Sequence, residues 1–200
     1  MKIIWPSTAL LTCLLLLNGC AGTPERPRST GAWIDDNILE VAIEREIRAS
    51  DEAYKGAHLV VVVYDGLVLL LGQVPSEQLK AQAAAVAAGM YKVDAAKVHN
   101  HLSVSGPISM LARTNDGLLT TKVKTRLLAS EAVRGLRVKV ISENGVVYLL
   151  GAVTSEQADA SVTEAQKAFG VQRIVKVFQF TDLGSVSYTH LTLPTTWLVL

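Results

Sequence analysis

The chain is poor in the residues from which catalytic and metal sites are usually built. Of its 200 residues, only two are cysteine and four are histidine. It has no Gly-rich loop ending in Lys-Ser or Lys-Thr for a phosphate, and no Gly-Xaa-Ser-Xaa-Gly segment around a nucleophile. We therefore find no catalytic constellation. The sequence predicts a protein that is not an enzyme and that needs neither a cofactor nor a metal.

Three short motifs could be mistaken for sites. His99 and His101 share one face of a predicted strand, but no third ligand is near them in the sequence, so we expect no metal site there. The pairs Ser76-Glu77 and Ser155-Glu156 resemble an acid beside a nucleophile. Both pairs stand at predicted helix starts, where Ser caps the helix and Glu favours its dipole, so we interpret both as caps.

Both cysteines lie near the N-terminus, in a segment typical of a secretion signal. Lys2 precedes an apolar run over residues 10–17, far shorter than the ~20 residues of a membrane-spanning helix. The run ends in Leu17-Asn18-Gly19-Cys20, which resembles the bacterial lipobox, whose cysteine becomes the lipidated first residue of the mature protein. We predict a signal peptide over 1–19 and lipidation of Cys20. The alternative is an ordinary signal peptide with an incidental cysteine.

The segments next to the two ends differ from the rest of the chain. By analogy with lipoprotein sorting, Ala21 in place of Asp favours the outer membrane. Residues 21–31 hold two prolines, two glycines and two arginines, and we predict a flexible tether over 20–34. Residues 185–200 resemble a translated transposase adapter from sequencing libraries, so we predict an artefact there and exclude it from the fold.

The middle of the chain is an internal repeat. The segment 65–78 recurs as 144–157, with Gly, Val and Ser-Glu-Gln at a common offset of 79. Each copy places Asp-Gly or Asn-Gly between two apolar runs, which predicts a hairpin. The second run is too continuous to have a solvent face, so it predicts a central strand.

Each copy predicts the order α-β-β-α-β. A helix with an apolar stripe (Leu39, Ile43 and Ile47, or Leu119, Val123 and Leu127) precedes the hairpin, and a second helix and a third strand follow it. Because the second helix is a crossover, strands two and three should be parallel. We predict an α+β fold of two domains, 35–104 and 116–181, joined by a linker over 105–115. Each domain is a three-stranded mixed sheet packed on two helices.

The helix, the hairpin and the Gly-Xaa-Val-Xaa-Ser-Glu-Gln turn resemble the BON domain, present here twice. A lipobox followed by two such units resembles the dual-BON outer-membrane lipoproteins over residues 10–181. The segments that match this group best are Asn115-Asp116, 120–123, 143–145 and 175–178. The resemblance implies a lipid-anchored phospholipid-binding protein on the periplasmic side of the bacterial outer membrane, which supports envelope integrity without catalysis.

Equivalent regions of the two predicted domains carry opposite charge. Residues 35–64 hold seven acidic and three basic residues, whereas residues 113–142 hold seven basic and two acidic residues. On a helical wheel, Leu118, Lys122, Lys124 and Leu128 point away from the core stripe of the helix over 118–128. Exposed leucines among cations are typical of a helix at a membrane surface. The candidate lipid-binding residues are Leu118, Lys122, Lys124, Arg126 and Leu128.

Two other interpretations stay open at this point. In one, the helix over 118–128 is a solvated basic helix, with Leu118 and Leu128 packed under a loop or against the first domain. In the other, the basic domain is a protein-interaction adaptor that docks an acidic partner. The partner we expect is an anionic phospholipid membrane, with an envelope protein as the second candidate. We expect neither a nucleic acid nor a small-molecule substrate.

Overall fold

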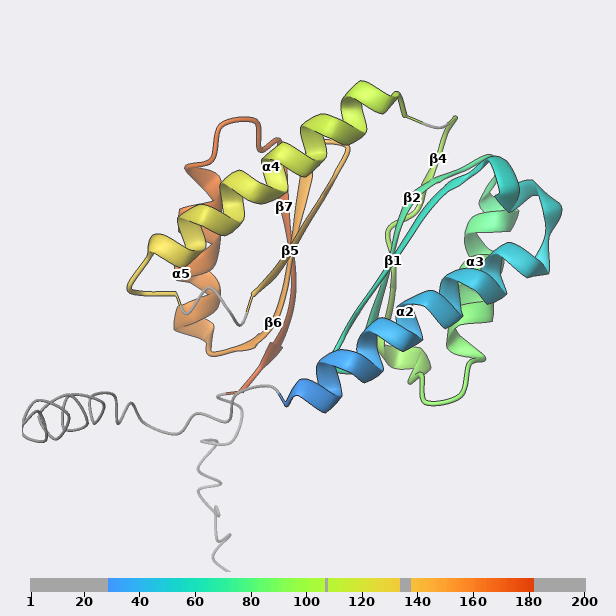
Figure 1. Cartoon of the computed structure of the whole chain (residues 1–200), viewed down its shortest axis with the longest axis horizontal. Coiled ribbons are helices and arrows are strands. Elements are labelled where there is room, and N and C mark those ends of the chain that lie inside the picture. Colours follow the sequence, from blue (N-terminus) through green and yellow to red (C-terminus); the bar gives the residue numbers. More distant parts are fainter. Residues whose placement is uncertain (1–28, 107, 134–137, 182–200) are drawn as a thin grey trace, which may run out of the picture.

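The computed structural model describes residues 29–106, 108–133 and 138–181, which form two α+β units packed sheet against sheet (Figure 1). The first unit contains α2 (Thr30–Ser50), η2 (Glu52–Gly56), β1 (His58–Tyr64), β2 (Leu67–Val74), α3 (Glu77–Ala88), η3 (Ala95–Lys97), β3 (Val98–Asn100) and β4 (Ser103–Val104). The second contains α4 (Met110–Ala129), β5 (Lys139–Glu143), β6 (Val146–Val153), α5 (Ser155–Gln166) and β7 (Arg173–Phe180). The α+β fold and the predicted element order are confirmed. The predicted signal peptide, Cys20 and the predicted artefact lie outside the described residues.

The first helix of each unit begins earlier than the apolar stripes predicted. Helix α2 begins at Thr30, inside the segment predicted as a tether, and α4 begins at Met110, inside the predicted linker. A serine caps each helix: the Ser29 hydroxyl accepts from the Ala32 amide at 3.1 Å, and the Ser109 hydroxyl accepts from the Ala112 amide at 3.2 Å. Both helices therefore extend into the segments predicted as tether and linker.

Both sheets have the predicted mixed topology. In the first, β2 pairs antiparallel with β1 and parallel with β3 and β4; in the second, β6 pairs antiparallel with β5 and parallel with β7. The third strand is continuous in the second unit but is divided into β3 and β4 in the first. Both pieces keep one register on β2, because Val98 lies opposite Val68 and Ser103 opposite Gln73.

The hairpins turn as the Asp-Gly and Asn-Gly pairs predict. Asp65 and Gly66 have φ angles of 50° and 77°, and Asn144 and Gly145 have φ angles of 49° and 74°. Positive φ at both central residues defines a type I′ turn, whose twist matches the flanking strands. The same turn at equivalent positions is the strongest local signature of the repeat.

The second helix of each unit is capped by a different residue. Ser76 caps α3 as predicted, because its hydroxyl accepts from the Leu79 amide at 3.2 Å. The prediction for Ser155 is wrong: Thr154 caps α5, in a capping box with Gln157. The first unit has Pro75 at the position of Thr154. Proline offers no side-chain acceptor, so there the cap falls one residue later.

Three apolar clusters hold the molecule together. One lies between the first sheet and helices α2 and α3, with Ile43 and Ile47 fully buried. A second lies between the other sheet and helices α4 and α5, with Leu119, Val123 and Leu127 buried. The third lies between the two sheets, formed by Val62, Tyr64, Leu67, Leu69, Leu71, Tyr148, Leu150 and Val177. The layers therefore run helix, sheet, sheet, helix, and both faces of each central strand are covered (Figure 1).

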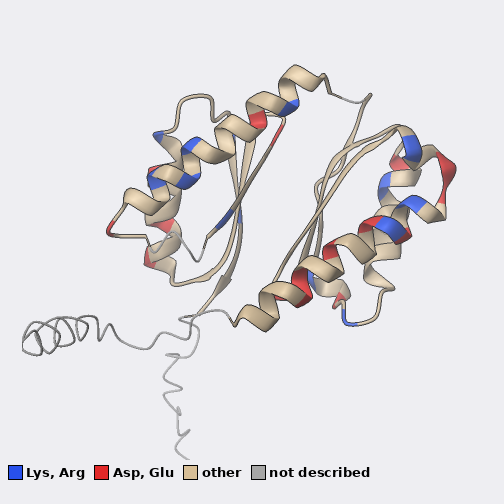
Figure 2. Ribbon diagram, in the orientation of Figure 1, with Lys and Arg blue, Asp and Glu red and all other residues tan. Residues whose placement is uncertain are grey.

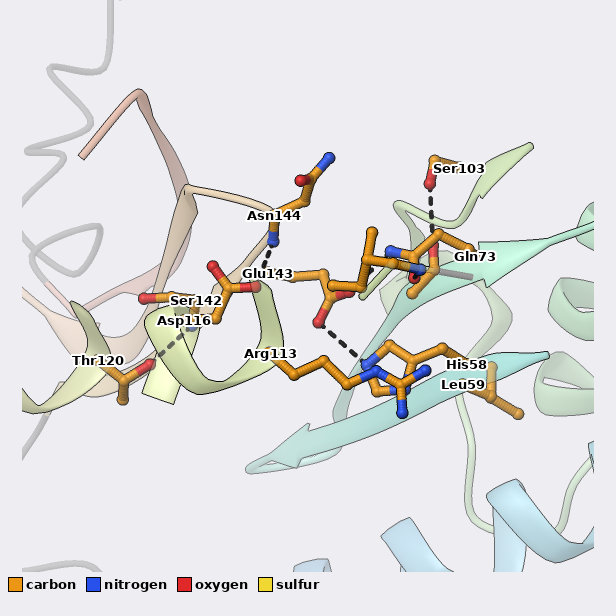
Figure 3. A network of polar contacts seen from close by, with 12 residues as sticks. His58, Leu59, Gln73, Ser103, Arg113, Asp116, Thr120, Ser142, Glu143 and Asn144 are labelled. Atoms are coloured by element: carbon orange, nitrogen blue, oxygen red, sulfur yellow. Dashed lines mark hydrogen bonds and ion pairs between the residues drawn. The ribbon is translucent and has the colours of Figure 1, made fainter. Parts of the chain in front are cut away.

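Polar contacts surround the third cluster. The Gln73 amide donates to one oxygen of Glu143 at 2.7 Å, and the other oxygen lies 3.3 Å from His58 Nε2 (Figure 3). Lys139 of the second unit bonds to the Glu40 carboxylate and donates to the Val63 carbonyl at 3.2 Å. These contacts fix the register of one sheet on the other.

Candidate functional site

Two side chains on the inner face of α4 fix its rotation on the sheet. The Asp116 carboxylate accepts from the Asn144 amide at 2.8 Å and from the Gly145 amide at 2.9 Å (Figure 3). The Thr120 hydroxyl accepts from the Ser142 amide at 3.0 Å. Because these contacts hold α4 by the hairpin and by the edge strand β5, they determine which of its residues face outwards.

Side chains of α2 make equivalent hydrogen bonds to the backbone of the first sheet. The Asp36 carboxylate accepts from the Asp65 amide at 2.8 Å, and Glu40 accepts from the Val63 amide at 2.8 Å. Asp36 and Asp116 stand 80 residues apart and are each 7% exposed. The sequence interpretation missed this role, although a buried-face Asp three residues before each apolar stripe is a visible signal.

The predicted lipid-binding residues all lie on the outer side of α4. Leu118 is 56% exposed and Leu128 is 59% exposed, so the interpretation that packs them under a loop or against the first domain is wrong. Lys122, Lys124 and Arg126 are exposed as well. Within the described ranges, none of these three cations takes part in an ion pair.

The structure does not bring the five residues into one cluster. At about 100° per residue, Lys122 and Arg126 lie on the flank of α4 next to Leu118, whereas Lys124 and Leu128 lie on the opposite flank. A residue from another element joins the first group: the Lys122 Nζ lies 5.8 Å from the centroid of the Phe169 ring. Phe169 is 89% exposed. It lies in the segment that follows α5, which ends at Gln166.

A cavity of about 390 Å³ lies between α4, the β5–β6 hairpin and the loop after α5. The polar residues that line it include Asn115, Asn144, Gln172 and Lys122, and Leu118 and Phe169 line it as well. The Asp116 carboxylate also lines it but is engaged by the hairpin amides. The residues around the cavity thus include one cation, three residues with carboxamide side chains and two exposed apolar residues.

The outer helices of the two units differ in charge, as the sequence indicates. Helix α2 carries five acidic and two basic residues, and α4 carries four basic and one acidic residue (Figure 2). The positions of Lys124 and Arg126 correspond, at the offset of 80, to Glu44 and Glu46 in the first unit. The duplicated helix thus presents opposite electrostatic surfaces in one molecule.

His101, the residue after β3, takes part in the contact between the sheets. The His101 ring meets the Tyr148 ring edge to face, with centroids 5.4 Å apart. Burial, helped by the neighbouring His99, lowers the pKa of His101 from its usual value. Across the described part of the chain, no three His, Cys, Asp or Glu side chains are grouped to hold a metal ion.

Comparison with known proteins agrees with this architecture. The BON domain family model matches residues 35–106 and 115–182, which together cover most of the chain, so the chain belongs to the BON-domain family. It is 39% identical over 184 residues to the outer membrane lipoprotein DolP of Haemophilus influenzae, covering 86% of this chain and 94% of that protein. The dual-BON, DolP-like character expected from the sequence is thereby confirmed.

Two further relatives show the spread of the family. The chain is 34% identical over 157 residues to a 21 kDa hemolysin of Actinobacillus pleuropneumoniae, covering 78% of this chain and 80% of that protein. It is 28% identical over 145 residues to the osmotically-inducible protein Y of Escherichia coli, covering 72% of each. None of the three relatives is named for an enzymatic activity.

The comparisons also bear out the predicted localisation, which is the bacterial outer membrane, as a lipoprotein. Among the described residues, no helix is long and apolar enough to cross a membrane. Lipidation of Cys20 stays a prediction, since that residue lies outside the described part of the chain.

Proposed function

We propose that the protein binds anionic phospholipid, without catalysis, on the periplasmic side of the outer membrane and thereby supports envelope integrity. A lipid on Cys20 anchors it, and the outer face of α4 contacts the bilayer. The observation that carries the proposal is the exposed apolar pair Leu118 and Phe169 at one cavity with Lys122, a cation without an acidic partner in the described residues.

The expected binding free energies favour a contact that assists the lipid anchor rather than one that replaces it. Each cation near an anionic leaflet contributes about 1 kcal/mol, so Lys122, Lys124 and Arg126 together contribute about 3 kcal/mol. Partial burial of Leu118 and Phe169 adds roughly 1–2 kcal/mol each. A total on the order of 5–7 kcal/mol corresponds to a dissociation constant of roughly 0.01–0.2 mM. Such binding is too weak for stable attachment alone, which agrees with a lipid anchor as the first of two membrane signals.

The cavity beside α4 gives the contact a place for a lipid headgroup. Its volume of about 390 Å³ suits a small polar group. Lys122 supplies a charge for a phosphate, while Asn115, Asn144 and Gln172 offer amides for hydrogen bonds. Leu118 and Phe169 then point toward the acyl region.

Vesicle co-sedimentation tests the proposal. The chain from residue 21 onward retains every described residue, and it should bind phosphatidylglycerol vesicles but not phosphatidylcholine vesicles, with binding that falls as salt rises. Lys122→Glu with Lys124→Glu changes the local charge by −4 and should weaken binding at least about tenfold. Lys55→Glu with Lys97→Glu makes the same change in total charge on the first unit and should have little effect.

The main alternative is an adaptor whose basic α4 docks an acidic envelope protein, because unpaired cations suit either partner. The same experiment separates the two functions. Failure of the chain to bind anionic vesicles at low salt would favour the adaptor. Equal losses of vesicle binding in both double variants would mean that α4 does not make the lipid contact. Circular dichroism of both variants should match the parent chain, since all four lysines are exposed.

A further inference from the structure

The solvent face of α2 carries an apolar stripe, of which only Ile38 has an apolar residue, Leu118, at the equivalent position of α4. Ile34, Ile38 and Val41 are 47%, 63% and 67% exposed, and Trp33 beside them is 56% exposed. Positions 34, 38 and 41 follow helical spacing and so share one side of α2, opposite the buried Ile43 and Ile47. A contiguous apolar stripe on a solvent face marks a contact surface rather than scattered exposure.

The length of chain before α2 determines what lies near this stripe. Nine peptide steps separate Cys20 from the N-cap residue Ser29, so the start of α2 can lie at most about 30 Å from the predicted lipid. A short tether turns a weak surface contact into an intramolecular event at an effective concentration in the millimolar range. The membrane around the anchor is therefore the surface that the stripe meets most often.

We propose that the α2 stripe, Trp33, Ile34, Ile38 and Val41, is a second membrane-contact surface, which rests on uncharged or zwitterionic lipid beside the anchor. Trp33 suits the interface, where its apolar ring and polar N–H each find a partner. Arg45 continues the side of the stripe, and the exposed Asp35 and Glu46 lie on one flank of it. Because α2 carries five acidic and only two basic residues, an anionic leaflet repels it as a whole. This surface goes beyond the α4 contact and rests on the proposed anchor at Cys20.

The two surfaces exclude each other on one flat bilayer. Helices α2 and α4 cover opposite outer sides of the paired sheets, and their exposed faces point away from the sheets (Figure 1). Zwitterionic lipid therefore selects the orientation with α2 on the membrane and α4 toward the periplasm. Anionic lipid selects the reverse, so the local lipid composition determines which helix is presented.

One substitution makes Trp33 a fluorescence reporter of contact between α2 and the membrane. Of the three tryptophans, Trp5 lies in the predicted signal peptide and Trp197 near the C-terminus, so Trp197→Phe leaves Trp33 alone in the chain from Cys20 onward. Cys20 is the single cysteine of that chain. It can be coupled to a maleimide phospholipid, which anchors the protein whether or not a cell lipidates it.

The experiment measures quenching of Trp33 by brominated acyl chains. In phosphatidylcholine vesicles we expect strong quenching, reduced at least about threefold by Ile38→Ser with Val41→Ser, since both side chains leave the bilayer. Met110→Ser, at a 75% exposed apolar position at the start of α4, should change nothing there. Unquenched Trp33, or quenching that the double variant leaves intact, overturns the proposal, because tether proximity alone would then explain the signal.

A second set of measurements tests whether the lipid composition selects which of α2 and α4 rests on the membrane. In phosphatidylglycerol vesicles Trp33 should be quenched less, and Lys122→Glu with Lys124→Glu should restore the quenching seen in phosphatidylcholine. Equal quenching in both lipids overturns this selection. Failure of the α4 contact itself appears elsewhere, as lost binding of the unanchored chain to anionic vesicles, so the two failures are distinguishable.

Discussion

Replacing Asp116 tests how the candidate site is held in place. Its carboxylate is 7% exposed and accepts two backbone hydrogen bonds, at 2.8 and 2.9 Å, from the turn of the β5–β6 hairpin. Asp116→Ala leaves both amides without this acceptor. The amides belong to Asn144 and Gly145, which the type I′ turn holds at positive φ.

The expected cost follows from those two bonds. A hydrogen bond to a charged acceptor contributes about 1.5–3 kcal/mol, so losing two of them in Asp116→Ala should lower the free energy of unfolding by about 3–6 kcal/mol. That is a large part of the 5–15 kcal/mol typical of a folded domain. Asp116→Asn keeps one acceptor oxygen and should lose roughly half as much. Asp36→Ala should destabilise the first unit in the same way, through its bond to the Asp65 amide at 2.8 Å.

Urea denaturation followed by far-ultraviolet circular dichroism measures the effect. At a slope of about 2 kcal/mol per molar urea, the midpoint for Asp116→Ala should fall by about 2 M. The control is Asp159→Ala, since the Asp159 side chain is 79% exposed and lies 3.8 Å from Lys176. Its midpoint should move by less than about 0.3 M. If Asp116→Ala behaved like that control, the carboxylate would not be what orients α4, and the reasoning about its outer face would fail.

Three smaller changes test other parts of the fold. Gly72→Ala should destabilise by more than about 3 kcal/mol in the same assay, because φ is 114° and a Cβ would lie 1.9 Å from the His58 carbonyl oxygen. Thr154→Ala should cost about 1 kcal/mol and Ser155→Ala distinctly less, since Thr154 caps α5. His101 has a lowered pKa, so the unfolded chain takes up its proton first as pH falls below 6.5. Stability should therefore decrease on acidification, and His101→Phe should flatten that part of the pH profile.

Local patterns were enough to predict the topology of each unit. The Asp-Gly and Asn-Gly turns and the continuous apolar runs after them place the central strands correctly, because turn chemistry and strand burial are local properties. The outward face of α4 was predictable for the same reason, since helical periodicity alone separates Leu118 from Leu119. Helix starts were predicted less well, because Ser29 and Ser109 extend α2 and α4 beyond their apolar stripes.

The remaining features depend on contacts between distant segments. The apolar run of β2 indicates that both of its faces are buried, but it does not say that another sheet covers one of them. Glu143 meets His58 and Gln73 across separations of 85 and 70 residues, and no periodicity connects them. Phe169 joins the site because the loop after α5 returns to α4, so a wheel drawn for α4 alone omits it.

The pairing of the sheets explains how a duplicated domain can acquire two different surfaces. An isolated unit would expose Leu69 and Leu71, or Tyr148 and Leu150, on the second face of its sheet, so each unit needs the other to bury them. That pairing turns both helix layers outwards and in opposite directions (Figure 1). Because the outer sides of α2 and α4 make no part of this shared core, their charges can diverge at little cost in stability. The acidic α2 and the basic α4 are the result, and a single fold then presents two outer faces of different chemistry.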